Sequence, residues 1–149
     1  MSDESSPGEE PHRTVVSVRY SETDAMGVAH HASYLPWLEL GRTGWIRGRG
    51  EGRSYRRLEE AGYFLPVVEL SCRYHLPARY DDELAVLTTL REASRIRFVF
   101  DYRVEHGADG GLLATARTEH AVVDGAGRPR RLPTTVHQWL LGDDAAAPP

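Results

Sequence analysis

Apolar residues occur at two different spacings along this chain, and the spacing predicts where strands and helices lie. From Thr14 to Tyr20 the spacing is two residues, with Val16, Val18 and Tyr20 on one face, which is typical of a strand with one buried face. From Ser33 to Arg47 apolar residues recur at helical spacing, which predicts the main helix with Ser33 as its cap. A short second helix is predicted from Ser54 to Ala61, because Ser54 can cap it and Gly62 can end it.

The second half of the chain is predicted to form consecutive strands. Segments rich in β-branched and aromatic residues run over 64–74, 84–91, 95–105 and 112–123. Turn residues separate them, as in the HGADGG stretch at 106–111. One strand, one main helix and about four antiparallel strands make an α+β fold, with a single long helix against a five-stranded antiparallel sheet.

A sheet of this size has to be covered on one face and protected at its edges. Gly41 and Gly44 each cost about 1 kcal/mol inside a helix relative to alanine, so we interpret them as points where the helix approaches the sheet closely. Long strands also leave an edge with unpaired backbone groups. A dimer that joins two sheets edge to edge would cover that edge and create clefts between subunits.

The length of 149 residues fits one domain. We place this domain at residues 13–141. The flanking segments, residues 1–12 and 142–149, consist largely of Ser, Asp, Glu, Ala, Pro and Gly and are predicted to be disordered tails.

Composition excludes several classes of function. The formal net charge of −4 argues against a general nucleic-acid binder, and no apolar run is long enough for membrane insertion. The acidic N-terminal segment does not resemble a signal peptide, so we expect a cytoplasmic protein. With Cys72 as the one cysteine and seven histidines at no zinc-binding spacing, we expect neither a metal nor a cofactor.

The densest polar cluster lies between the first strand and the main helix: Glu22, Asp24, His30, His31 and Tyr34. A helix start offers unpaired N–H groups that can stabilise an oxyanion, and a nearby carboxylate can activate water or attack a carbonyl. From spacing alone, the favoured interpretation of Asp24 is a turn residue that bonds its own backbone, because Asp is common in such turns. A metal-binding pair at His30 and His31 is disfavoured, because neighbouring side chains diverge and no third ligand follows.

Residues 22–46 (ETDAMGVAHHASYLPWLELGRTGWI) closely resemble the signature of the 4-hydroxybenzoyl-CoA thioesterase family of hotdog-fold proteins, particularly its acyl-CoA thioester hydrolase branch. The match includes Asp24 and Gly27 of the family's Asp-x-x-Gly element, followed by His31, Ala32 and Tyr34 at the family's offsets. The resemblance covers roughly residues 14–137.

This resemblance implies a hotdog fold, in which a five-stranded antiparallel sheet wraps around one long helix. It also implies a homodimer or homotetramer with sites at the dimer interface. Asp24 would be the catalytic carboxylate, as nucleophile or general base, and the backbone N–H of His31 would polarise the thioester carbonyl. Tyr34 would line the acyl pocket, and Gly27 would belong to the substrate-binding loop. Coenzyme A would enter only as part of the substrate.

Other residues are candidates for contacts with the rest of an acyl-CoA. Arg128 lies in an arginine-rich loop, and Arg95 and Arg97 alternate onto one face of a strand, so these three could meet the phosphates. For any one of them a solvated, aggregation-resistant surface is the favoured interpretation, whereas the set remains a candidate for the nucleotide end of the ligand. Glu69 lies on the strand face opposite Cys72 and is a candidate second acidic group at the cleft, although an edge or paired carboxylate is the favoured interpretation.

Two other functions remain open at this point. A hotdog thioesterase could act on acyl chains held by a carrier protein, with the same site residues. Alternatively, the chain could be a non-catalytic acyl-CoA-binding protein. The presence of Asp24 argues against a pure binder, because binding alone does not need a carboxylate at the thioester.

Overall fold

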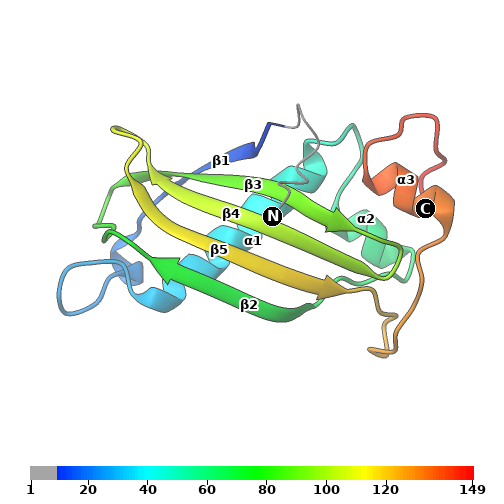
Figure 1. Cartoon of the computed structure of the whole chain (residues 1–149), viewed down its shortest axis with the longest axis horizontal. Coiled ribbons are helices and arrows are strands. Elements are labelled where there is room, and N and C mark those ends of the chain that lie inside the picture. Colours follow the sequence, from blue (N-terminus) through cyan, green and yellow to red (C-terminus); the bar gives the residue numbers. More distant parts are fainter. Residues whose placement is uncertain (1–9) are drawn as a thin grey trace, which may run out of the picture.

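In the computed structural model, which describes residues 10–149, one antiparallel sheet curves around a central helix (Figure 1). The strands are β1 (His12–Ser17), β2 (Val67–Tyr74), β3 (Glu83–Ala93), β4 (Arg97–His106) and β5 (Leu112–Ala121). Their order is β1-β3-β4-β5-β2, which makes β1 and β2 the edges. The predicted fold, a five-stranded antiparallel sheet around one long helix, is confirmed.

Within residues 10–149, three α-helices accompany the sheet. The central helix α1 (Tyr34–Arg47) follows a short 3-10 turn at His31–Ser33, and α2 (Tyr55–Glu60) begins where the Ser54 side chain accepts a 3.1 Å hydrogen bond from the Arg57 N–H. The third helix, α3 (Thr134–Leu140), was not predicted. Its buried residues are Val136, Trp139 and Leu140, and their helical spacing after Pro133 is a signal that the sequence did contain.

The close approach of α1 to the sheet, predicted from its glycines, is confirmed. A Cβ atom on Gly41 would lie 2.5 Å from Thr88 Oγ1, and one on Gly44 would lie 2.7 Å from Thr14 Oγ1. Any larger side chain would therefore push the helix away from β1 and β3. Glycine at these two positions offsets its helix cost by allowing tight packing.

The first strand is shorter than predicted. β1 ends at Ser17, and Tyr20 begins a 3-10 turn (Tyr20–Glu22). Tyr20 is 78% exposed, with its ring 5.7 Å from that of Tyr80, so the alternating pattern assigned it wrongly to the buried face. The chain leaves the sheet here to build the loop that leads into α1.

The loop at residues 20–33 lies at one end of the sheet, whereas α2 and α3 lie at the other end (Figure 1). At the α3 end, the segment 142–149 differs from the disordered tail expected there. Arg53, which is buried, donates hydrogen bonds to the carbonyls of Trp139 and Asp143 and to the Asp144 carboxylate, at 2.6–3.1 Å. The predicted tail at residues 1–12 lies mostly outside the described residues, and His12 already belongs to β1.

No helix in residues 10–149 has the length and apolar character needed to cross a membrane.

Candidate active site

Asp24 occupies the first position of a tight turn between two paired residues, Thr23 and Ala29. Its Oδ1 accepts hydrogen bonds from the backbone N–H groups of Met26, at 2.8 Å, and Val28, at 3.4 Å. Gly27 closes the turn at a φ of +78°, a conformation that favours glycine. Because Oδ1 holds the turn, only Oδ2 is left without a partner in the described chain, and this oxygen can face a substrate.

The Asp24 turn is fastened to the start of α1 by Glu22, which is only 8% exposed. The Glu22 carbonyl accepts hydrogen bonds from the His30 N–H at 2.7 Å and from the Ser33 hydroxyl at 2.9 Å. Its carboxylate accepts one from Trp37 Nε1–H at 3.0 Å. Glu22 therefore fixes the distance between the turn and the helix, a role that sequence analysis did not assign to it.

The start of the helix differs in detail from the prediction. His30 caps the 3-10 turn at His31–Ser33 that precedes α1, because its Nδ1 accepts a 3.1 Å hydrogen bond from the Ala32 N–H. Ser33, at the N-cap position of α1, makes no capping hydrogen bond and is bound to Glu22 instead. The N–H of His31 donates to no acceptor within residues 10–149. This free donor points out of the positive end of the helical segment, where it can stabilise negative charge.

Two tyrosines lie next to His31: Tyr34 at the start of α1 and Tyr74 at the end of β2. The hydroxyl of Tyr74 donates a 2.8 Å hydrogen bond to the His31 carbonyl, and its ring packs edge-on against the Tyr34 ring at 5.0 Å. Burial raises the pKa of Tyr74 to about 12, with Cys72 contributing, and burial also raises the pKa of Tyr34. Both phenols therefore stay protonated at neutral pH. Tyr74 lies 43 residues from His31, so no local spacing identified it.

The remaining predicted residues are not brought to Asp24 within one chain. Glu69 is exposed on β2 and pairs with Glu119, about five residues and therefore roughly 16 Å from the Tyr74 end of that strand. Arg97 is neutralised by Glu92 and Glu119, each at 2.7 Å. Arg95 donates to the Leu132 carbonyl at 2.6 Å.

Arg128 lies exposed in the turn that follows β5. Together with Arg95 and Arg97 it occupies the α3 end of the sheet, opposite the Asp24 turn. Only a second copy of the chain would place these three arginines near Asp24. Within residues 10–149, no group of three or more His, Cys, Asp and Glu side chains is arranged to hold a metal ion.

Comparisons with known proteins identify the family. A model of the thioesterase-like superfamily matches residues 18–140. The acyl-CoA thioester hydrolase YbgC of Escherichia coli O6:H1 is 32% identical over 125 residues, which cover 83% of this chain and 91% of that protein.

Two solved structures are similar over most of the chain. The Thermus thermophilus protein TT1821 has a TM-score of 0.80 and 40% identity, covering 87% of this chain and 96% of its own. The DHNA-CoA thioesterase of Staphylococcus aureus has a TM-score of 0.75 and 32% identity, covering 80% and 78%.

Proposed function

The chain belongs to the thioesterase-like superfamily of hotdog-fold thioester hydrolases, and we propose that it hydrolyses an acyl-CoA thioester to a free acid and coenzyme A. The observation that carries the proposal is that two groups have no hydrogen-bond partner within residues 10–149: Oδ2 of Asp24 and the N–H of His31. Glu22 holds the two segments together. One group can activate or deliver a nucleophile, and the other can receive the charge that develops on the carbonyl oxygen.

Two routes are consistent with this arrangement. As general base, Asp24 takes a proton from water, the water oxygen attacks the carbonyl, and the thiolate leaves. As nucleophile, Oδ2 attacks the carbonyl itself, the thiolate leaves, and water hydrolyses the resulting acyl–aspartyl anhydride. In both routes the His31 N–H stabilises the oxyanion, and such a donor contributes roughly 2.7–4 kcal/mol in other enzymes. Because the backbone of His31 does this work, His31→Ala should keep most of the activity.

The experiment is thiol release from a panel of acyl-CoAs, from short to long and from aliphatic to aromatic. We expect turnover of some members by the wild type and its loss in Asp24→Asn, which keeps the shape of the side chain and removes its charge. Turnover unaffected by this change would exclude Asp24 as the catalytic group. Binding of acyl-CoA without turnover would make the chain a binding protein, and the absence of both would point to carrier-protein substrates.

We also propose that the enzyme is a homodimer joined through β2. This strand is an edge of the sheet, and three of its apolar side chains are exposed: Val67, Val68 and Tyr74. Antiparallel pairing of two β2 strands would place the α3 end of one subunit, with its arginines, beside the Asp24 turn of the other.

The mass in solution tests this arrangement. Val68→Asp should convert a dimer to a monomer in analytical ultracentrifugation, because it buries a charge at the new interface. Val15→Asp is the matched control, since Val15 is similarly exposed on the other edge strand, β1. Dissociation by Val15→Asp but not by Val68→Asp would contradict this proposal and place the interface at β1.

A further inference from the structure

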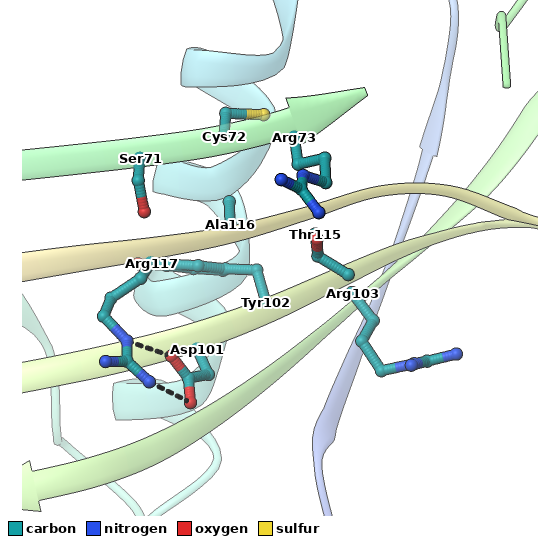
Figure 2. Close-up of a pocket in the computed structure, with 9 residues that line it drawn as sticks. All are labelled: Ser71, Cys72, Arg73, Asp101, Tyr102, Arg103, Thr115, Ala116 and Arg117. Carbon is teal, nitrogen blue, oxygen red and sulfur yellow. Dashed lines mark hydrogen bonds and ion pairs between the residues drawn. The ribbon is translucent and has the colours of Figure 1, made fainter. Parts of the chain in front are cut away.

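A groove of about 650 Å³ lies on the face of the sheet that points away from α1 (Figure 2). It crosses three neighbouring strands, and each supplies an arginine: Arg73 from β2, Arg117 from β5 and Arg103 from β4. None of these arginines takes part in the site built around Asp24, which lies on the helix side of the sheet.

Strand register explains both the groove and its arginines. Arg73 pairs with Thr115, and Thr115 pairs with Arg103, so two long side chains flank one short one in a single row across the sheet. Neighbouring strands are about 4.8 Å apart, which sets the backbones of Arg73 and Arg103 roughly 10 Å apart. In the adjacent row, Ser71 pairs with Arg117. The short side chains of Ser71 and Thr115 form the floor of the groove, and the longer arginine side chains form its walls.

The groove carries an excess of positive charge. Its one carboxylate, Asp101, binds Arg117 through two hydrogen bonds at 2.7 and 3.2 Å, drawn in Figure 2. Arg103 contacts Glu105 outside the groove, through Nε at 3.2 Å. Arg73 forms no ion pair or hydrogen bond with any residue in the described part of the chain. The three guanidinium groups are therefore balanced by two carboxylates, Asp101 in the groove and Glu105 beside it, and the charge of Arg73 is left over.

We propose that this groove is a binding site for a phosphate or diphosphate group. The planar guanidinium of arginine matches phosphate oxygens with paired hydrogen bonds, and two such groups on opposite walls can hold one anion between them. Ser71 adds a hydroxyl donor on the floor. The inference rests on the groove alone and holds whatever reaction Asp24 performs. The phosphate could come from the nucleotide of coenzyme A or from a separate phosphorylated compound.

Calorimetric titration with inorganic diphosphate tests the site directly, without any readout of hydrolysis. We expect Arg73→Gln and Arg103→Gln to weaken binding about tenfold or more, because each removes a charged hydrogen-bonding partner. Arg13→Gln is the matched control, since Arg13 is exposed on the far edge strand β1 and should leave binding unchanged. Asp24→Asn should also bind diphosphate normally, so failure of the thioesterase proposal would not affect this result.

A second titration, with coenzyme A, identifies the source of the phosphate. Competition with diphosphate, together with weaker binding to Arg73→Gln, would assign the groove to the coenzyme nucleotide. Coenzyme A binding that is indifferent to Arg73→Gln, while diphosphate binding is lost, would assign it to a separate ligand. The proposal is overturned if the wild type binds no diphosphate at millimolar concentration or if the arginine variants bind it as the wild type does. A change in oligomeric mass in these variants without diphosphate binding would likewise overturn it, and would make this face a contact between copies.

Discussion

Two turns in this protein are almost identical in local structure, yet only one of them adjoins the proposed catalytic site. Asp24 and Asp124 each begin an Asp-x-x-Gly turn, and each uses Oδ1 to accept hydrogen bonds from the backbone N–H groups two and four residues later. The glycines that close them, Gly27 and Gly127, have φ values of +78° and +80°. Neither glycine has a neighbour that would contact an added Cβ.

The surroundings of the two turns differ. After the Asp24 turn, the chain passes the free N–H of His31 and enters α1. After the Asp124 turn, it runs through an extended segment in which Arg130 lies over the Tyr63 ring at 4.1 Å, and reaches α3 only at Thr134. The Asp-x-x-Gly pattern therefore specifies a turn. In the proposed mechanism, what distinguishes the Asp24 carboxylate is the N–H of His31 at the start of the helical segment, which has no acceptor within residues 10–149.

The largest expected effect separates the two aspartates by activity. Asp24→Asn should lower kcat by about 10²-fold or more, because a positioned acid–base group contributes on that order. Asp124→Asn changes the same hydrogen bonds and should leave kcat within about threefold of wild type. The measurement is steady-state thiol release for both variants on one substrate. Equal losses of kcat in the two variants would mean that activity depends on the structure of the turns and not on the charge of the Asp24 carboxylate.

The next effect concerns stability near the Asp124 turn. His120 is buried beside this end of the sheet, where its Nδ1–H donates to the Leu65 carbonyl and its Nε2 accepts from the Thr118 hydroxyl. Burial lowers the pKa of His120 from 6.5 to about 4. Between these values the unfolded chain binds a proton that the folded chain does not, so stability should fall as the pH is lowered from about 6.5 to 4, by about 3 kcal/mol.

Urea unfolding at several pH values measures this loss. His120→Gln should remove most of the pH dependence that the wild type shows in this window. A variant that retains the full dependence would show that carboxylates, not His120, produce it.

A smaller effect tests how the Asp24 turn is held to the helix. The Glu22 carboxylate accepts hydrogen bonds from the Arg19 backbone N–H and from Trp37 Nε1–H. Glu22→Gln removes the negative charge and so weakens the connection between the Asp24 turn and α1. We expect about a tenfold loss in kcat with little change in KM. Hydrogen bonds to a charged group are worth roughly 1.5–3 kcal/mol, and only part of the energy lost at Glu22 should raise the activation free energy. Trp37→Phe should act in the same direction. A fall in melting temperature with unchanged kcat would make Glu22 purely structural.

The smallest effect should be the same at both turns. Gly27→Ala and Gly127→Ala each force a side chain into the left-handed backbone region, which costs about 1–2 kcal/mol. Because the geometry of the two turns is shared, we expect equal losses of unfolding free energy in urea. A clearly larger loss at Gly27 would show that the Asp24 turn is also braced by contacts beyond its own hydrogen bonds.

Several features of the fold and site followed from local patterns. Alternation predicted the first strand, β-branched and aromatic content between turn residues predicted the other four, and the helical spacing after Ser33 predicted α1 within one residue of its observed start at Tyr34. The same patterns failed where the chain leaves regular structure. Tyr20 belongs to a turn and not to β1, and Ser33 binds Glu22 where a cap was expected. In both cases a loop contact outweighed the local preference.

The sequence by itself determined the approximate positions of the strands and of the first two helices, because spacing and turn residues are short-range features. The two groups proposed for chemistry, Asp24 and the N–H of His31, were identified through the resemblance of residues 22–46 to a known family. Only the tertiary structure decided that Glu22 joins them, that Tyr74 closes the site from 43 residues away, and that Asp124 lacks such a setting. It also decided that three arginines from three strands share one groove. Alternation tells which face of a strand a residue occupies. Strand order and register tell which residues become neighbours, and these depend on the packing of the whole sheet around α1.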